Sequence, residues 1–249
     1  MCIDFELIDI DRISKKMKET PPISTDPILG SKPLFPRQWS SYPKWHGPLI
    51  SQSLLELIRA TSKWKGQTEF KFLDKEKNKY FYDNLVFNGS LDIAIAIECK
   101  RNLDQPDSDA IKRISNYQKI VDGNKKKFSK ACGLSNSANV FFCVFDAYGP
   151  RKKSFNFPII YPENLEEIFG SCVLDAWHGF EKTFYEQLID LGLDCNKNYA
   201  DRVRQFESLE DLKNKCDDIT QIEDCIPTLD KIIPIFSKTY GQNIIALSD

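Results

Sequence analysis

The 249-residue chain is poor in the residues that build several common functional sites. It has two histidines, and none of its eight cysteines forms a Cys-x-x-Cys pair, so the spacing of a four-ligand zinc site is missing. No Gly-rich loop ends in Lys-Ser or Lys-Thr, which excludes a motor ATPase and predicts no nucleotide cofactor. The signature of a Ser-His-Asp hydrolase is missing too. Several cysteines lie in apolar runs, so we expect reduced, buried thiols rather than a disulfide framework.

Long apolar runs are also lacking. No stretch approaches the roughly 18 uninterrupted apolar residues of a membrane helix, and the first residues do not place a basic segment before an apolar one. We therefore expect a cytoplasmic protein without a membrane span. The net charge of -2 excludes a strongly basic coat protein of nucleic acid, but it leaves open a DNA enzyme with a local basic surface.

What is present is an ordinary globular composition, with 41% hydrophobic and 28% charged residues. We divide the chain into an irregular or helical N-terminal extension (1–48), a core (49–160) and a mostly helical C-terminal region packed on the core (161–249). Hydrophobic spacing in the core predicts helices over 51–65 and 109–121 and strands over 69–73, 79–87, 90–100 and 140–145. Further helices are expected over 164–191, with breaks at Gly170 and Gly179, over 201–215, and over 229–238, where Pro234 weakens the prediction. This order predicts an α/β sandwich around a mixed sheet.

The most informative stretch is residues 82–100, which has the pattern of two strands joined at an Asn-Gly turn. The first strand carries Asp83 near its start. The second strand is apolar until its far end, where Glu98 and Lys100 stand. Side chains two residues apart in a strand share a face, so Glu98 and Lys100 are expected to point the same way, with Cys99 opposite.

Two acids are candidates to share a metal ion with Glu98. Asp92 lies on the same strand, but six extended residues span roughly 20 Å, which is too far for one ion to bridge. Asp83 lies on the partner strand, and a tight two-residue turn would leave it several residues short of Glu98. A loop over about 88–92, or a bulge, would instead pair Asp83 with Ile97, next to Glu98. We therefore predict the wider loop or a bulge, with Asp92 kept as the alternative acid.

Two carboxylates and an ammonium at one end of a hairpin suit the hydrolysis of phosphodiester bonds. Magnesium prefers few carboxylates together with water and phosphate oxygens, so Asp83 and Glu98 are the expected ligands of Mg²⁺. Lys100 could orient the attacking water, help to deprotonate it, or stabilise negative charge on the phosphate. The pattern therefore predicts a metal-dependent nuclease.

The hairpin resembles the core of the PD-(D/E)xK nuclease superfamily, and the likeness covers about residues 50–146. Asp83 matches the first acid of the motif, Glu98 the second acid and Lys100 the lysine, while Tyr82 stands where the family has its proline. The segment is also similar to the nuclease domain of type I restriction motor subunits. The resemblance implies a restriction endonuclease-like fold with a central mixed sheet flanked by helices, and cleavage of double-stranded DNA.

The same resemblance suggests two further candidates. Members of these families often place another acid on the first helix, where this chain has Glu56. Some members carry a glutamine on the helix after the lysine, where Gln118 stands here.

Basic residues follow the motif in two clusters. Lys125, Lys126 and Lys127 come after the predicted helix, and Arg151, Lys152 and Lys153 come after the last predicted strand of the core. Residues 100–153 contain 12 Lys or Arg against 5 Asp or Glu, in a chain that is acidic as a whole. We expect these clusters to lie beside the metal site and to bind the phosphates of DNA; the alternative is a pair of solvated loops.

The function expected first is that of a stand-alone type II restriction endonuclease. A homodimer is expected by analogy, because two active sites are needed to cut both strands together. Two alternatives stay open: a repair or junction nuclease that recognises DNA shape, and a nuclease-fold protein that binds DNA or a partner without cutting. The simplest rival to all three is an amphipathic hairpin whose polar end faces solvent.

Overall fold

The computed structural model describes residues 42–103, 108–149, 155–190, 195–217 and 227–237. In chain order its elements are α3 (Tyr42–Thr61), β1 (Lys65–Leu73), β2 (Lys79–Asn88), β3 (Ile93–Lys100), α4 (Ser108–Gly123), α5 (Lys125–Ala131), β4 (Asn139–Asp146), β5 (Ile159–Ile160), α6 (Asn164–Phe169), α7 (Ser171–Asp190), α8 (Lys197–Arg204), α9 (Leu209–Asp217) and α11 (Leu229–Ser237). Within these ranges no helix combines the length and the apolar character that crossing a bilayer requires.

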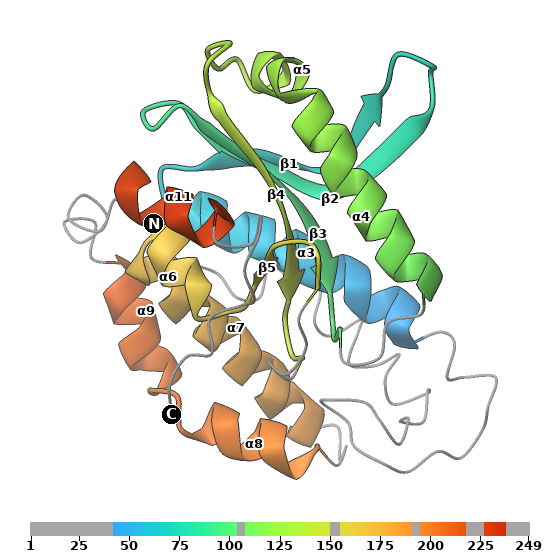
Figure 1. The fold of residues 1–249 in the computed structure, drawn as a ribbon. Helices are drawn as coiled ribbons and strands as arrows, with labels where there is room; N and C mark the ends of the chain where they lie inside the picture. Colours follow the sequence, from blue (N-terminus) through green and yellow to red (C-terminus); the bar gives the residue numbers. More distant parts are fainter. Residues whose placement is uncertain (1–41, 104–107, 150–154, 191–194, 218–226, 238–249) are drawn as a thin grey trace.

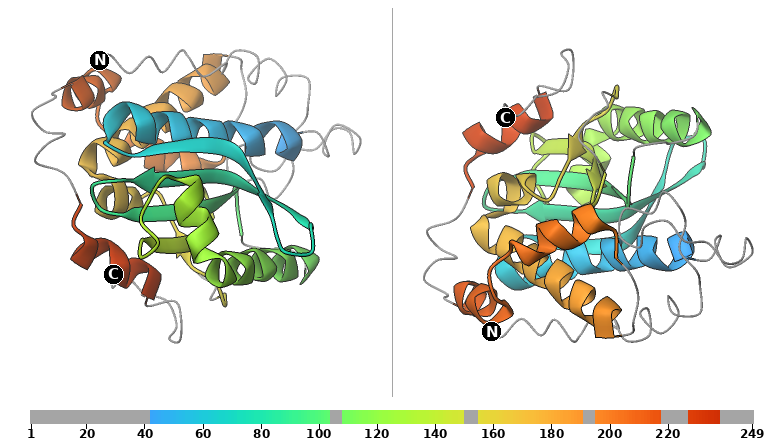
Figure 2. Two further views of the ribbon diagram at one scale, coloured as in Figure 1. Left: turned by 90° about the horizontal axis from the view of Figure 1, so that it is seen from above. Right: turned by 90° about the horizontal axis from the view of Figure 1, so that it is seen from below.

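The strands form one mixed sheet in the order β1-β2-β3-β4-β5. The first three are antiparallel neighbours, whereas β4 and β5 run parallel to β3. Helices α3 and α7 lie on one side of the sheet, and α4 and α5 cover the other (Figures 1 and 2). The predicted α/β class with a mixed sheet flanked by helices is therefore confirmed.

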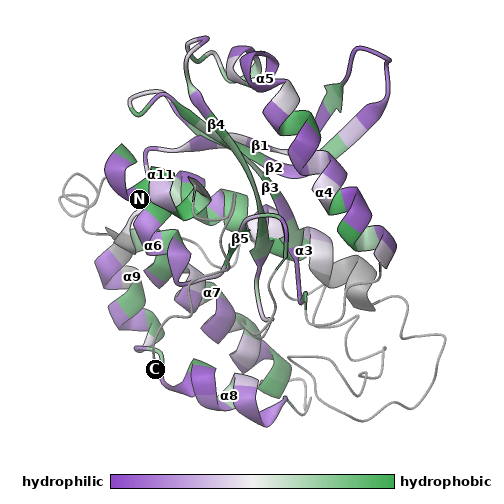
Figure 3. Cartoon of the chain, in the orientation of Figure 1, coloured by the Kyte–Doolittle hydropathy of each residue, from purple (hydrophilic) through white to green (hydrophobic). Residues whose placement is uncertain are grey.

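Strand β3 lies in the middle of the sheet and divides its residues by size between the two sides. Ile93, Ile95 and Ile97 enter the cluster shared with α3 and α7, while Ala94 and Ala96 face the α4 and α5 side. The small alanines leave room on that side for large rings: those of Tyr82 and Phe128 lie 5.5 Å apart between centroids, and those of Tyr82 and Phe142 lie 6.2 Å apart. The mostly hydrophobic colouring of the central strands in Figure 3 reflects burial on both faces.

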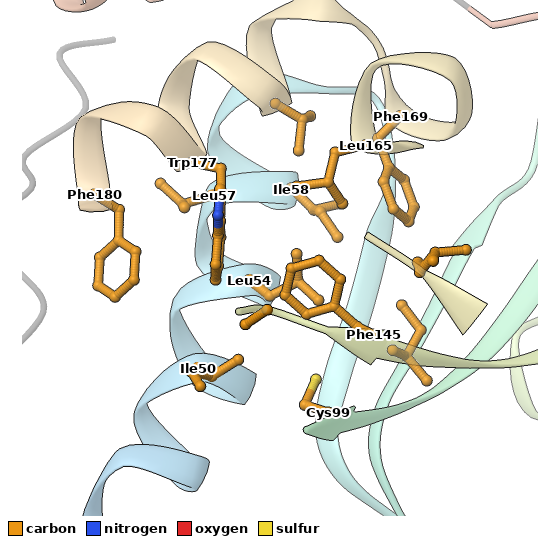
Figure 4. Packing of buried hydrophobic residues seen from close by; sticks show 14 of the residues in the cluster. Ile50, Leu54, Leu57, Ile58, Cys99, Phe145, Leu165, Phe169, Trp177 and Phe180 are labelled. Carbon is orange, nitrogen blue, oxygen red and sulfur yellow. The ribbon is translucent and has the colours of Figure 1, made fainter. Parts of the chain in front are cut away.

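The larger core unites the sheet with the C-terminal helices (Figure 4). Trp177 of α7 meets Phe145 of β4 edge to face, with ring centroids 5.0 Å apart, and Trp64 meets Phe169 in the same manner at 4.9 Å. Such contacts stabilise beyond the area they bury. The helices after the sheet are thus part of the same packing unit as the strands that carry Glu98 and Lys100.

Helix α3 differs from its prediction at both ends. It begins at Tyr42, inside the segment expected to be irregular, and it contains Pro48. It ends at Thr61 rather than Lys65. Two side-chain hydroxyls donate to backbone carbonyls of its last turn: Thr61 Oγ1 to Leu57 O at 2.7 Å and Ser62 Oγ to Ile58 O at 2.5 Å. The expected strand over 69–73 consequently starts earlier, at Lys65.

The C-terminal helices also correct the prediction in part. The chain breaks at Gly170, whose φ of 110° favours glycine, but α7 continues through Gly179 without interruption. The region expected to form one helix over 201–215 forms two, α8 and α9, and the short strand β5 was not predicted. Helix α11 forms as expected, with Pro234 inside it.

Candidate active site

The register between β2 and β3 brings Asp83 close to Glu98. Four residues, 89–92, separate the two strands, and pairing runs from Asn88 opposite Ile93 to Asn84 opposite Ile97. The last backbone pair sets Asn84, not Asp83, opposite Ile97, so Asp83 stands just beyond this pair, toward Glu98. The wider loop is confirmed, and the register differs by one residue from the prediction.

The turn itself is held by the side chain of Asn88. Its Oδ1 accepts the backbone N–H groups of Ser90 at 3.0 Å and Leu91 at 3.2 Å. An asparagine that bonds the chain two and three residues ahead stabilises a turn longer than the two-residue hairpin. The loop length that brings the two acids close together is thus encoded locally.

The carboxylate of Asp83 ends the ladder between the two strands. Its Oδ2 accepts the backbone N–H of Cys99 at 2.7 Å, beyond the last backbone pair. From the other side, Ser51 of α3 donates its hydroxyl to the carbonyl oxygen of Asp83 at 3.3 Å, while Nδ2 of the buried Asn84 donates to Ser51 O at 2.9 Å. These contacts fix the position of Asp83 against both β3 and α3.

Glu98 and Lys100 lie together on the α4 side of the sheet, as the strand period predicts. Nζ of Lys100 donates to Oε1 of Glu98 at 2.6 Å, while Cys99 between them packs in the opposite cluster. Glu98 is only 6% exposed, so its charge is desolvated and Lys100 compensates for it.

Burial shifts both carboxyl groups toward the neutral form. It raises the pKa of Asp83, and Lys100, the Cys99 N–H and Arg113 oppose that rise without cancelling it. Burial likewise raises the pKa of Glu98, and the negative charge of Asp83 adds to the rise, against Lys100 and Arg113. The two acids therefore repel each other across the strands, as two carboxylates that share a cation site do before the cation binds.

Changing Asp83 to Asn should raise the melting temperature at neutral pH. A carboxyl group whose folded pKa lies above its unfolded value contributes most stability below the unfolded pKa, and that contribution is lost as pH rises through the folded pKa. At neutral pH the wild type therefore carries an unfavourable buried charge that Asn removes. The gain should vanish below about pH 3, where the acid is protonated in both states. Thermal melts of both proteins across this pH range test it.

The control for this experiment is Asp109→Asn, because the side chain of Asp109 is 90% exposed. This variant should follow the wild type at every pH. A lower melting temperature for Asp83→Asn at neutral pH would show that the favourable contacts of Asp83 outweigh its burial, contrary to the raised pKa.

Helix α4 contributes two residues that the sequence did not single out. The charge of Arg113 acts on both Asp83 and Glu98. Burial raises the pKa of Tyr117, and the charge of Glu98 adds more to this rise than that of Asp83. The hydroxyl of Tyr82 donates to Tyr117 O at 3.1 Å, which ties β2 to this helix. Hydrophobic spacing predicted the helix, but only the fold shows which of its polar side chains face the strands.

Asp146 is a further buried acid near the site that the sequence did not single out. It ends β4, next to Lys100 in the register between β3 and β4, and is 2% exposed. Its carboxylate accepts the N–H of Leu103 at 3.2 Å and the N–H of Gly149 at 3.0 Å. Asp146 thereby joins the two loops that leave β3 and β4.

The other proposed acids lie elsewhere. Asp92 is at the opposite end of β3, where its carboxylate accepts both the N–H and the hydroxyl of Ser135, so it is not in a position to share an ion with Glu98. Glu56 lies on α3, which covers the other side of the sheet, and its exposed carboxylate pairs with Arg59 at 3.3 Å. Gln118 is buried on α4, and no hydrogen bond within the described ranges joins it to Asp83 or Glu98.

The expectation that the lysines of the first basic cluster bind DNA beside the metal site stays a prediction. Nζ of Lys127 lies 5.5 Å from the centre of the Phe72 ring of β1, and Phe128 of the same helix packs on Tyr82, next to Asp83. Lys125, Lys126 and Lys127 begin α5, and the loop after α5 bonds Asp92 through Ser135, at the end of β3 away from Glu98. Helix α4, with 16 residues and so about 24 Å long, runs between the two ends. The second cluster, Arg151, Lys152 and Lys153, falls outside the described residues.

The arrangement at Asp83 and Glu98 fits a hard divalent cation with few protein ligands. Among the described residues, no hydrogen bond reaches Oδ1 of Asp83 or Oε2 of Glu98, so each acid keeps one oxygen for a ligand. No group of three or more His, Cys, Asp or Glu gathers for a metal ion in the described part of the chain. Two carboxylates completed by water and substrate oxygens are the donor set that Mg²⁺ prefers.

Comparisons of this chain with models of protein families, with curated proteins and with solved structures found no match.

Proposed function

We propose that this protein is a Mg²⁺-dependent endonuclease that hydrolyses phosphodiester bonds in double-stranded DNA. The observation that carries the proposal is the closeness of Asp83 to Glu98: Asp83 accepts the Cys99 N–H, its charge acts on Glu98, and Lys100 bonds Glu98. These residues match the two acids and the lysine of the PD-(D/E)xK pattern, with Tyr82 in place of its proline. An amphipathic hairpin with a solvated polar end would not bury Glu98 to 6% exposure.

Each side chain has a role that its position supports. Asp83 and Glu98 are the residues that would hold Mg²⁺, which when bound supplies a Lewis acid for the phosphate and lowers the pKa of a coordinated water. Lys100 opposes the rise in the pKa of Glu98 and presents a proton donor beside it. Arg113 on α4 adds an exposed cation that can compensate for the charge of a phosphate.

The reaction is the in-line attack of water on phosphorus. A new bond forms between the water oxygen and phosphorus, and the bond to the leaving oxygen of the sugar breaks. Lys100 is the residue placed to stabilise the charge that develops during this step, since its ammonium already lies against Glu98. Burial raises the pKa of Glu98, and a divalent cation held by the two acids would lower that pKa and favour the ionised carboxylate.

Cleavage of supercoiled plasmid with Mg²⁺, and its loss with EDTA, is the direct test of this function. The family resemblance favours a type II restriction enzyme that acts as a homodimer, so discrete fragments from the plasmid are the expected product. Nicked, flap and four-way substrates offered alongside the duplex separate this activity from that of a structure-specific nuclease. Failure to cut any of these substrates with Mg²⁺ would reject the proposal.

Mg²⁺ should stabilise the protein through the same two acids. A ligand that binds only the folded state at a free concentration of about 100 times its Kd adds roughly 2.7 kcal/mol to the free energy of unfolding. A Mg²⁺ titration followed by thermal melting should therefore raise the melting temperature of the wild type and of Glu56→Gln. It should not raise that of Glu98→Gln. An equal shift in Glu98→Gln would mean that the cation binds elsewhere.

A further inference from the structure

Strands β1 and β2 continue beyond the sheet as a two-stranded arm. We use the name arm for residues 70–82. Pairing between β2 and β3 ends with Asn84 opposite Ile97, whereas pairing between β1 and β2 goes on to Leu73 opposite Lys79. Figure 1 shows this ribbon projecting past the neighbouring strands, near α5. The arm begins next to Asp83, and so it starts at the proposed active site.

The two faces of the arm differ sharply. On the inner face Phe72 stacks on Phe128 of α5 with ring centroids 4.7 Å apart, and Tyr80 meets Tyr117 of α4 at 6.0 Å. On the outer face the side chains are exposed; they are Lys71, Leu73, Lys79 and Phe81. The inner contacts hold the arm in place and thereby leave the outer face open for a partner.

The outer face alternates apolar and basic residues. Lys71 lies opposite Phe81, and Leu73 lies opposite Lys79, so the two apolar side chains occupy one diagonal and the two lysines the other. Phe81 is 51% exposed and Leu73 47%, and they are two of the three large apolar side chains exposed in the described part of the chain. Exposed apolar groups beside cations are typical of a binding surface.

The surroundings of the arm extend its positive charge. The turn adds exposed Lys75 and Lys77, while Asp74 of the same turn is engaged by the N–H groups of Glu76 and Asn78. The basic cluster of α5 lies alongside, because Nζ of Lys127 stands 5.5 Å from the centre of the Phe72 ring. The arm and the start of α5 thus present seven exposed lysines, which are Lys71, Lys75, Lys77, Lys79, Lys125, Lys126 and Lys127.

We propose that the arm is a DNA-contacting ribbon that enters a groove of the duplex, with Phe81 and Leu73 against the bases and the lysines on the phosphates. The choice of DNA as partner rests on the proposed function. A two-stranded ribbon fits the major groove, whose width is about 12 Å, and apolar side chains there contact thymine methyl groups. A second copy of this chain is a poorer occupant, because symmetric pairing would bring the lysines of both copies together.

The arm also accounts for how substrate would reach the acids. Phe81 is two residues from Asp83, about 7 Å along the strand. A duplex gripped by the arm therefore passes close to Asp83 and Glu98. The basic cluster of α5 holds the flanking duplex.

Fluorescence anisotropy of a labelled DNA duplex, measured on the full chain in EDTA so that nothing is cut, tests this role. The double variant Leu73→Ser/Phe81→Ser should raise the Kd for the duplex by about 10-fold or more, because it loses its apolar contacts with the bases. Lys71→Gln/Lys79→Gln should reduce the slope of log K against log salt by about 2, since each phosphate contact contributes about 0.9. Matched controls are Ile189→Ser, exposed to the same degree on α7, and Lys65→Gln at the other end of β1.

The outcomes separate the arm from the active site. Weaker binding in the arm variants alone supports the inference, even if the wild type cuts no DNA and the proposed function falls. A wild type that cuts plasmid, together with arm variants that bind duplex as tightly as the controls, overturns the inference and leaves the function standing. An arm variant that keeps its DNA affinity but changes the molecular mass in sedimentation also overturns it, since the face would then join two copies.

Discussion

Replacing Glu98 by Gln is expected to lower the rate of plasmid cleavage by about 10³-fold or more, because catalytic charge stabilisation by a bound ion is worth several kcal/mol. Asp83→Asn should have a similar effect, since two carboxylates are all that the chain offers the ion in its described part. Lys100→Gln should cost about 10²-fold, in the range of a single lost charge stabiliser. Single-turnover cleavage at saturating Mg²⁺ measures all three.

Two acids that lie away from Asp83 and Glu98 provide the control variants. Glu56→Gln alters an exposed carboxylate on the opposite side of the sheet, and Asp92→Asn alters an acid at the far end of β3. Both should cut at the wild-type rate. If Asp92→Asn were inactive in a well-folded protein while Asp83→Asn cut normally, the active site would have been assigned to the wrong acid.

Phe128→Ala should be the most damaging single change to the α4 and α5 side of the protein. Phe128 is completely buried, and its ring lies 5.6 Å from Phe70, 4.7 Å from Phe72 and 5.5 Å from Tyr82 between centroids. Truncating a buried Phe costs about 3–5 kcal/mol, because the cavity collapses only in part. For a chain of this size that loss lowers the melting temperature by roughly 6–20 °C, and calorimetry measures it.

Two further variants show whether this loss comes from packing. Ile189→Ala removes a large apolar side chain that is 47% exposed and should change the free energy of unfolding by less than about 0.5 kcal/mol. Phe128→Leu keeps most of the volume and should cost less than about 1.5 kcal/mol. A melting temperature for Phe128→Ala as high as that of Ile189→Ala would contradict the described packing of α5 under the β1–β2 arm.

The strands of the site could be predicted because their signals are local. Alternation in β3 identified a strand with Glu98 and Lys100 on one face, and that face is observed. The need to bring Asp83 back to Glu98 predicted a loop wider than two residues. The register was still one residue off, because it depends on how Asn88 bonds the turn, which the turn dipeptide alone does not reveal.

The rest depends on contacts between distant segments. Nothing near Arg113 marks it as a neighbour of two acids some 15 to 30 positions earlier, since that follows from how α4 lies over the sheet. The contact of the α5 lysines with the arm depends on the fold in the same way, since Lys127 meets Phe72 only because α5 packs on β1 and β2. Helix α3 extends into the segment expected to be irregular or helical, and packing of its apolar side on the sheet keeps it intact around Pro48.

The hydrogen bond from the Cys99 amide to Asp83 gives that acid two separate duties. One oxygen fastens the end of β2 to β3, and the other is left for chemistry. A descendant of this protein that no longer cut DNA would therefore be expected to retain Asp or Asn at position 83, because the strands still need an acceptor there. Lys100, whose ammonium hydrogen-bonds only Glu98 in the described contacts and so fastens no strand, would be the first of the three to be replaced. In a survey of natural variants, the lysine is thus a better indicator of surviving activity than the first acid.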